Sequence, residues 1–218
     1  METIKDLYDL THTLAAEYLS GFTYPWEALK GIKELILSLG PNLGADYTEV
    51  SENVWVHKTA TVAPTAFLGA PCIIGAGAEV RHCAFIRGSA LVGENCVVGN
   101  SVELKNVILF DNVQTPHYNY VGDSILGYKS HMGAGSITSN VKSDKTLVVV
   151  KDGSTHIETG RKKFGAILGD HVEVGCNSVL NPGTVLGRGT SVYPTSSVRG
   201  AIPPNSIYKK EGNIVTRK

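Results

Sequence analysis

Charge imbalance is absent from this sequence of 218 residues, in which 20 Lys and Arg residues balance 20 Asp and Glu residues. A neutral chain lacks the positive field that attracts nucleic acid or an anionic membrane surface, so we expect neither as a partner. No apolar run approaches the roughly 18 residues that a membrane-spanning helix needs, and the N-terminus has no signal-peptide pattern. The sequence therefore predicts a globular protein that is not anchored in a membrane.

Cysteine is scarce, and the motifs that hold metals or nucleotides are missing. The four cysteines, Cys72, Cys83, Cys96 and Cys176, form no CxxC pair, so a reduced, cytoplasmic protein is the simplest interpretation. The seven histidines are scattered without an HxxxH pair, and we therefore expect no metal. There is neither a Walker sequence nor a GxGxxG that follows a strand.

A period of six residues is present instead, together with 24 glycines. Large apolar residues recur every six positions from Val56 to Phe110 and again from Leu168 to Val198, and a smaller apolar residue usually stands two positions earlier. A hexapeptide period is typical of a parallel β-helix, in which three short strands and their corners make one 18-residue coil. We therefore predict an all-β solenoid over residues 51–210, followed by a tail at 211–218.

Residues 1–50 follow a different pattern. Apolar residues at helical spacing predict one helix from Ile4 to Tyr18, and a second begins at Pro25 and continues to Leu39. Two short amphipathic helices cannot bury a core alone, so we expect this region to pack on the solenoid or on a neighbouring subunit.

Two basic residues, Arg87 and Lys105, stand 18 positions apart, and the repeat therefore stacks them on adjacent coils. Unpaired like charges so close repel each other, so an anion is expected beside them. It could be a carboxylate, from Glu103 or Asp111, or the phosphate of a ligand.

The segment PHYNYVGDS, residues 116–124, is interpreted as an interruption of the repeat after Phe110. It places His117 outside the apolar interior, one coil after Glu103, and so raises the expectation of a functional role. A second departure is the insertion at 139–165, which predicts a hairpin with its turn at Asp152-Gly153. It ends in the basic run 161–163, which is either a solvated face or a contact for phosphate or carboxylate.

The stretch GNSVELKNVILFDNVQTPHYNYVGDS, with GAGSITSN shortly after it, resembles the acetyltransferase domain of the bifunctional enzymes that N-acetylate glucosamine-1-phosphate and then uridylylate the product. The segment TGRKKFGAILGD is similar to the archaeal sugar-phosphate nucleotidylyltransferase/acetyltransferases. The resemblance covers roughly residues 54–205 and implies a left-handed parallel β-helix with an inserted hairpin. No uridylyltransferase domain is recognisable, so a separate nucleotidylyltransferase could be a partner.

The resemblance also implies site residues. The family's catalytic base falls on His117, its carboxylate partner on Glu103 and an active-site asparagine on Asn140. The substrate-binding positions fall on Arg87, Lys105, Tyr120, His131 and Lys163, where His131 replaces an asparagine of the bacterial enzymes. The coenzyme A contacts fall on Ala134, Asn140, Cys176, Pro194 and Lys209.

These residues predict an acetyl-CoA-dependent N-acetyltransferase that acts on an amino-sugar phosphate similar to glucosamine-1-phosphate. Histidine suits the general base because its unperturbed pKa of about 6.5 lies near working pH. In this family coenzyme A lies between subunits, which implies a homotrimer. Three alternatives stay open: transfer to a nucleotide-linked or hydroxyl acceptor, a non-catalytic sugar-phosphate binding module, and a zinc hydratase of the carbonic-anhydrase type, which the histidine spacing disfavours.

Overall fold

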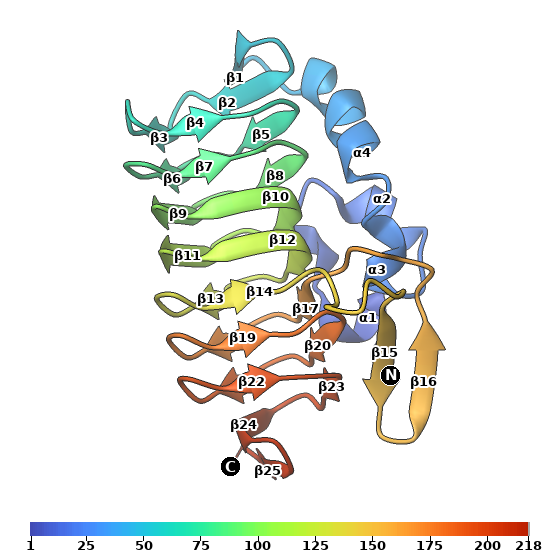
Figure 1. Ribbon diagram of the computed structural model, residues 1–218. Coiled ribbons are helices and arrows are strands. Elements are labelled where there is room, and N and C mark those ends of the chain that lie inside the picture. The colour runs from blue at the N-terminus through green and yellow to red at the C-terminus, as the bar shows by residue number, and fades with distance from the viewer. Residues whose placement is uncertain (218) are drawn as a thin grey trace.

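The computed structural model describes residues 1–217 and shows a solenoid of stacked coils with short helices along one side (Figure 1). Strands of successive coils pair in parallel, which confirms the parallel β-helix predicted from the hexapeptide period and the left-handed fold that the resemblance implies. Each coil has three flat faces separated by three corners. Within the described residues, no helix is long and apolar enough to cross a membrane.

The three faces are numbered here in chain order. The first face contains β2 (Val54–His57), β5 (Cys72–Ile74), β8 (Ala90–Val92), the later parts of β10 (Glu103–Leu109) and β12 (Tyr120–Leu126), β17 (Ala166–Leu168), β20 (Thr184–Leu186) and β23 (Ala201–Ile202). The second face contains β3 (Thr61–Val62), β6 (Glu79–Val80), β9 (Val97–Asn100), β11 (Gln114–His117), β13 (His131–Met132), β18 (Glu173–Val174), β21 (Ser191–Val192) and β24 (Ser206–Lys210). The third face contains β4 (Phe67–Leu68), β7 (Phe85–Ile86), the first parts of β10 and β12, β14 (Ile137–Thr138), β19 (Val179–Leu180) and β22 (Ser197–Val198).

Apolar side chains at the two repeating positions fill the interior of the solenoid. Cys72 and Ile74 pair with Ala90 and Val92 of the next coil, and all four are buried. The paired residues are 18 positions apart, as the hexapeptide count predicts. Burial raises the pKa of the Cys72 thiol to about 12, so the thiol stays protonated and acts as a packing group.

The coil that contains Lys105 is one residue shorter than predicted. Leu104 still pairs with Ile86, 18 positions earlier, but Val107 pairs with Ala90, only 17 positions earlier. One residue is therefore lost at the corner that follows Lys105. The next coil keeps the 17-residue spacing, because the β10 and β12 strands pair without a shift.

This shorter coil corrects two expectations. Leu109, and not Phe110, occupies the interior position above Leu126, and the Phe110 ring lies 4.8 Å from the ring of Tyr8. The segment 116–124 does not interrupt the solenoid, since β11 and β12 continue in parallel register with the coil before. The count changes before Phe110, at a corner where the sequence shows no obvious break.

The N-terminal region is helical, but in shorter pieces than the periodicity predicts. Its elements are α1 (Ile4–Leu7), η1 (Leu10–His12), α2 (Ala16–Ser20), α3 (Pro25–Ala28), α4 (Ile32–Leu39) and η2 (Gly40–Asn42). The first expected helix ends after α1, where the Asp9 side chain accepts a hydrogen bond from the backbone N–H of Thr11. The second is divided before Gly31, which is the N-cap of α4. The strand β1 (Tyr47–Ser51), antiparallel to β2, was not predicted.

The N-terminal region packs on the first face of the solenoid and borders the corner after Lys105 (Figure 1). Asn106 at this corner donates a hydrogen bond to the carbonyl oxygen of Leu29 at 3.0 Å. The Trp26 ring stacks on the ring of Phe164, near the end of the insertion, with 5.9 Å between the centroids. The helices and the insertion therefore meet beside the same corner.

The insertion forms the predicted hairpin, with β15 (Val149–Asp152) antiparallel to β16 (Thr155–Glu158). It projects from the side of the solenoid near the helices (Figure 1). At the other end of the chain, β25 (Asn213–Thr216) folds back on β24, so most of the expected tail belongs to a sheet. The last residue of that tail, Lys218, lies outside the described residues.

Candidate active site

Arg87 and Lys105 occupy the same corner on adjacent coils, as their spacing predicts. The residues before them, Ile86 and Leu104, are paired, and the backbone N–H of Arg87 donates to the Leu104 oxygen at 2.9 Å. This corner separates the third face from the first, and we call it the Arg87 corner. From coil to coil it contains Arg87, Lys105, Gly122, Ser139, Asn181 and Arg199.

Arg87 and Lys105 each form an ion pair with a different carboxylate. Arg87 Nη1 donates to Glu103 Oε1 at 2.8 Å, and Lys105 Nζ lies 3.0 and 3.2 Å from the two oxygens of Asp123. Glu103 was one of the two acids considered from the sequence. The other, Asp111, lies at a different corner and accepts from the backbone N–H of Glu94.

Asp123 is the centre of the polar contacts at the Arg87 corner. It was not among the site residues predicted from the sequence. Its side chain is 3% exposed and accepts from Lys105, from Asn106 at 3.0 Å and from Asn140 at 2.6 Å. Its φ of +49° suits Asp and Asn, which tolerate the left-handed region better than most residues. Asn106, 17 positions earlier, has the same conformation, and this Asn–Asp spacing is the signal that could have identified the corner.

Tyr120 lies on the third face beside this cluster. Its hydroxyl oxygen accepts from Asn140 Nδ2 at 3.1 Å, and among the described residues no acceptor for the hydroxyl proton is found. Burial raises the pKa of Tyr120, and the negative charges of Asp123 and Glu103 add to the rise. The phenol therefore stays protonated and can donate to a bound anion.

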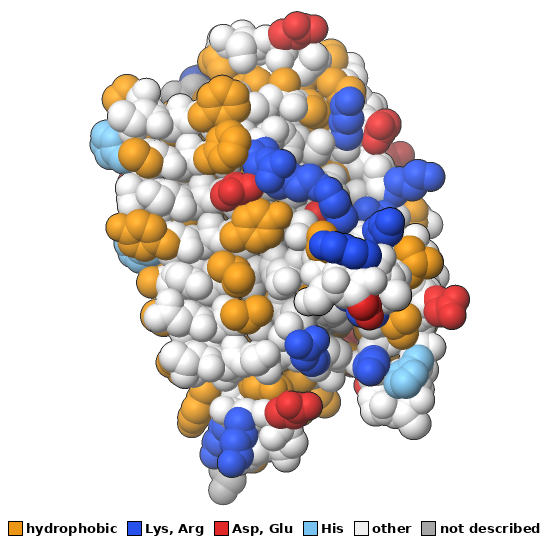
Figure 2. Space-filling model, in the orientation of Figure 1, with side chains coloured by type: hydrophobic (Ala, Val, Ile, Leu, Met, Phe, Trp, Pro, Cys, Tyr) orange, Lys and Arg blue, Asp and Glu red, His pale blue; other side chains and the backbone are white. Residues whose placement is uncertain are grey.

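Arg161 brings a third cation from the end of the insertion. Burial lowers its pKa, while the nearby Asp123 carboxylate opposes that change. Its Nε donates to the Lys163 oxygen at 3.2 Å, and it forms no ion pair within residues 1–217. The backbone N–H of Phe164 donates to Asn140 O at 3.0 Å, which places the preceding residue, Lys163, next to the cluster. Figure 2 shows Lys and Arg side chains gathered on this side of the molecule.

His117 lies at the opposite edge of the third face, at the end of β11, and its side chain is exposed. Its carbonyl oxygen accepts from the backbone N–H of Gly135, which places Ala134 next to it on the following coil. Equivalent bonds continue from Ala134 to Cys176 and from Cys176 to Pro194. We call this column, which begins at His82 and Asn100, the His117 corner. Val192 pairs with Tyr208, which places Lys209 opposite Tyr193, one position before Pro194 of this column.

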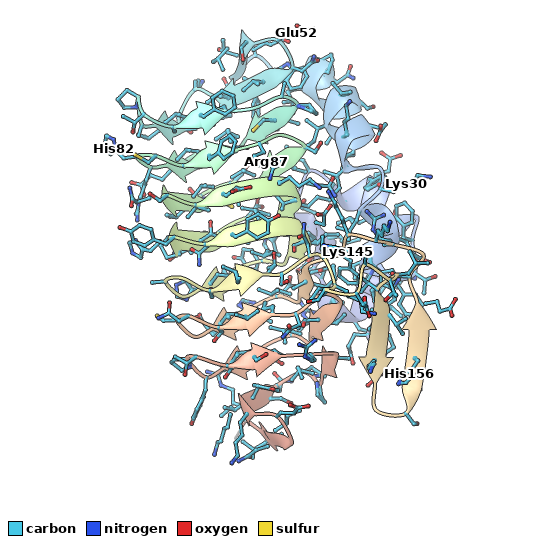
Figure 3. All side chains as sticks on the ribbon, in the orientation of Figure 1. Lys30, Glu52, His82, Arg87, Lys145 and His156 are labelled. Carbon is cyan, nitrogen blue, oxygen red and sulfur yellow. The ribbon has the colours of Figure 1, made fainter. Side chains whose placement is uncertain are left out.

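One face separates the two corners. His117 ends β11, Tyr120 begins β12, and Gly122 lies at the Arg87 corner, so five residues join the corners. At about 3.3 Å per residue, the Cα atoms of His117 and Gly122 lie at most about 17 Å apart. Figure 3 shows the same arrangement higher up, with His82 at one edge of the face and Arg87 at the other. Glu103 and Tyr120 occupy the strip between them.

One predicted residue does not join these contacts. His131 lies on the second face, where its Nδ1 is 2.9 Å from Glu173 Oε2, and no contact with the Arg87 corner is found for it within residues 1–217. The expected pairing of Glu103 with His117 stays a prediction, since the Glu103 carboxylate binds Arg87 in the structure. Among the described residues, no three His, Cys, Asp or Glu side chains converge as ligands for a metal ion.

The fold and these columns define a hexapeptide-repeat protein of the left-handed β-helix class. The model of the family described as the GMPPB C-terminal domain matches residues 70–188, and the chain belongs to this family.

Relatives of known name agree with the resemblance seen in the motifs. The bifunctional protein GlmU of Methanococcus maripaludis is 30% identical over 205 residues, which are 92% of this chain and 50% of that protein. The bifunctional sugar-1-phosphate nucleotidylyltransferase/acetyltransferase of Sulfurisphaera tokodaii is 29% identical over 189 residues, which are 85% of this chain and 47% of that protein. The chain thus spans about half the length of the curated relatives it matches. The prediction of a relationship to this group is confirmed.

Solved structures with a similar solenoid have low sequence identity. A hexapeptide transferase family protein from Anaplasma phagocytophilum has a TM-score of 0.42 and 15% identity, and the match covers 75% of this chain and 78% of that one. A variant of AntD, an N-acyltransferase from Bacillus cereus solved with dTDP and coenzyme A, has a TM-score of 0.38 and 18% identity, with 76% of this chain and 82% of that one covered.

Proposed function

We propose that this protein transfers an acetyl group from acetyl-CoA to the amine of an amino sugar whose anomeric oxygen carries a phosphate. The observation that carries the proposal is the placement of a stacked cation pair, Arg87 and Lys105, across one face from the exposed imidazole of His117. The relatives' names, which include sugar-1-phosphate and acetyltransferase, support the same chemistry.

The phosphate would bind at the Arg87 corner. Arg87 and Lys105 supply charge, and the hydroxyl proton of Tyr120 supplies a directed hydrogen bond. The carboxylates of Glu103 and Asp123 fix the two cations in place before the ligand arrives. Such preorganisation converts binding into orientation of the amine toward the opposite corner.

His117 would act as the general base. It takes a proton from the sugar ammonium, and the resulting amine attacks the thioester carbonyl carbon. A C–N bond forms, the C–S bond breaks, and the coenzyme A thiolate leaves and takes up a proton. The imidazole is exposed and no hydrogen bond to its ring is found among the described residues, so it is free to make this transfer.

The developing oxyanion needs a donor near His117. Of the three backbone N–H groups in Gly133–Gly135, those of Gly133 and Gly135 already donate to Val174 O at 2.7 Å and to His117 O at 3.0 Å. The N–H of Ala134, which has no protein acceptor within residues 1–217, is the available one. The Asn140 amide is less suitable, because it donates to Asp123 and Tyr120.

The direct test is a thiol-release assay with acetyl-CoA and a panel of hexosamine-1-phosphates, with the unphosphorylated hexosamines as controls. Thiol release that requires both the amine and the phosphate is the expected result. Hydrolysis of acetyl-CoA without an acetylated product, or transfer that ignores the phosphate, would contradict the proposal.

The Lys105→Ala variant is expected to raise the KM for the phosphorylated acceptor about 10- to 100-fold. A charge-assisted hydrogen bond contributes about 1.5–3 kcal/mol, and 1.4 kcal/mol is a factor of ten. Lys58→Ala is the matched control, since Lys58 also pairs with an aspartate but lies at the corner between β2 and β3, in the first coil of the solenoid. An unchanged KM in the Lys105 variant would show that the phosphate does not bind at this corner.

Cys176 gives a test of the coenzyme A column that does not depend on turnover. Cys83 and Cys176 are exposed, whereas burial raises the pKa values of Cys72 and Cys96 to about 12. We expect two of the four thiols of the native protein to react with iodoacetamide. Coenzyme A should slow the modification of Cys176 and leave Cys83 unaffected, as mass spectrometry of the peptides would show. Equal rates with and without coenzyme A would place the cofactor elsewhere.

A further inference from the structure

A polar groove of about 280 Å³ continues the Arg87 corner toward the C-terminal coils. Its lining comes from the loop after β14 and from two later coils of the Arg87 corner: Ser139, Val141, Lys142, Ser143, Asp144, Asn181, Pro182 and Arg199. Ser139 is two coils below Lys105 and Arg199 is four, so at about 4.8 Å per coil the groove spans roughly 10–19 Å from the Lys105 level.

The groove begins at the proposed acceptor site. Ser139 lines it, and the next residue, Asn140, donates to Asp123 and to the Tyr120 hydroxyl. The proposed coenzyme A column lies at the opposite edge of the third face, on the His117 corner. A ligand that extends from the Arg87 corner along the solenoid axis therefore enters this groove without crossing that column.

The inserted hairpin lies beside the groove, where Val149 and Lys151 line an adjacent pocket together with Lys142, Pro182 and Arg199. At Gly200, with φ +73°, a Cβ atom would lie 2.6 Å from the Lys151 carbonyl oxygen, and at Gly183, with φ +82°, it would lie 2.7 Å from the Val148 side chain. Glycine at these two corners lets β15 approach the solenoid closely. The groove is therefore a product of the insertion.

Polar groups in the groove are available for a ligand. Asn181 Nδ2 donates to Ser197 Oγ and to Val198 O, which fixes the amide while its Oδ1 has no partner within residues 1–217. Neither the Ser139 hydroxyl nor the Arg199 guanidinium has a hydrogen-bond or ion-pair partner in the described part of the chain. Lys142 is already paired with Asp144 at 3.2 Å.

This set of groups suits a nucleoside better than a second phosphate. Asn181 Oδ1 and the Ser139 hydroxyl can bond to the polar edge of a base or to a ribose hydroxyl. The planar guanidinium of Arg199 can stack on a base, and Pro182 adds an apolar surface. The acidic neighbours Asp144 and Glu211, which lie near Lys142 and below Arg199, disfavour an additional anion.

We propose that the acceptor is a nucleoside-diphosphate-linked amino sugar, whose diphosphate lies at the Arg87 corner and whose nucleoside lies in this groove. The inference rests on the proposed function for the sugar end of the ligand. The half-buried Arg161, which has no ion-pair partner within residues 1–217, is the additional cation that a diphosphate can use at the corner.

The test compares hexosamine-1-phosphates with UDP-, GDP- and dTDP-linked hexosamines in the thiol-release assay. The Arg199→Ala variant is expected to raise the KM for the preferred nucleotide-linked acceptor about 10- to 100-fold, and to leave the KM values for the hexosamine-1-phosphate and for acetyl-CoA unchanged. Lys145→Ala is the matched control, because Lys145 is exposed in the same loop but does not line the groove. A raised KM for acetyl-CoA would assign Arg199 to the cofactor and overturn the proposal.

A binding measurement separates this inference from the acetyl transfer itself. Calorimetric titration with UDP, GDP and dTDP should detect one nucleotide that binds the wild-type protein and binds Arg199→Ala at least 10-fold more weakly. That result supports the groove even if no acetyl transfer is found. Efficient transfer to a hexosamine-1-phosphate, with no binding of any of the three nucleotides, would overturn the groove proposal and leave the proposed function standing.

Discussion

Replacing His117 by alanine is expected to lower kcat for acetyl transfer by about 10²- to 10⁴-fold, the usual contribution of a positioned general base. The KM for the acceptor should change little, because the phosphate contacts come from the other corner of the face. The side chain is exposed and no hydrogen bond to its ring is found within residues 1–217, so its loss should leave thermal stability within the range of an ordinary surface substitution. Steady-state thiol release with saturating acetyl-CoA measures the effect.

His82→Ala is the matched control for this experiment. His82 lies two coils away in the same corner column and is also exposed, and its Nδ1 lies 3.0 Å from the Thr65 hydroxyl oxygen. We expect normal kcat from this variant. An unchanged kcat in His117→Ala, or an equal loss in both variants, would refute the assignment of the base.

Stacking along the solenoid is the part of the site that the sequence could predict. An 18-residue period is enough to place Arg87 above Lys105, because identical corners recur on each coil. The resemblance named Ala134, Cys176 and Pro194 separately, and the structure brings all three into one column below His117. Residues related by a period are thus predicted together, whatever their individual chemistry.

Asp123 was not predicted, because the segment that contains it, residues 116–124, was interpreted as an interruption of the repeat. The hexapeptide count treats the sequence before Phe110 as regular, but the residue lost after Lys105 changes the register of every following position. Asp123 stands 18 positions after Lys105, so an uninterrupted count would have stacked the two residues. In the structure the strand partner of Lys105 is Gly122, 17 positions later, and the Asp123 side chain reaches Lys105 from the next position. A deletion at a corner leaves the apolar pattern nearly intact. Val107 and Leu109, which take the interior positions in the structure, are as apolar as Ile108 and Phe110, which the 18-residue count places there, so the pattern alone does not reveal the deletion.

The N-terminal contacts were unpredictable for a different reason, since they join residues that no period relates. The Asp170 carboxylate, which is fully buried, accepts from the backbone N–H of Asp9 at 2.7 Å and of Tyr128 at 2.9 Å. It also accepts from Arg188 at 2.7 Å. A single side chain at the corner after β17 thereby joins the N-terminal segment, the β12–β13 corner and the next coil.

The Asp170→Ala variant is consequently expected to lose about 2–5 kcal/mol of unfolding free energy. Two backbone N–H groups lose their acceptor, and an unsatisfied buried donor costs about 1–3 kcal/mol. For a chain of this size the melting temperature should fall by roughly 5–20 °C. Asp170→Asn, which keeps one carbonyl oxygen as an acceptor, should show an intermediate loss, and Asp144→Ala, at an exposed position, should show almost none.

The part of the chain that loses stability in Asp170→Ala shows whether Asp170 holds the N-terminal region or stabilises the whole fold. Because Asp170 binds the segment that follows α1, hydrogen exchange in Asp170→Ala should accelerate first in residues 1–12. The helices also contact the active-site corner, through the hydrogen bond from Asn106 to Leu29, so a detached segment should raise the KM for the acceptor at temperatures below the global transition. Uniform acceleration of exchange along the chain, or a melting temperature equal to that of the wild type, would show that Asp170 does not hold the N-terminal region in place.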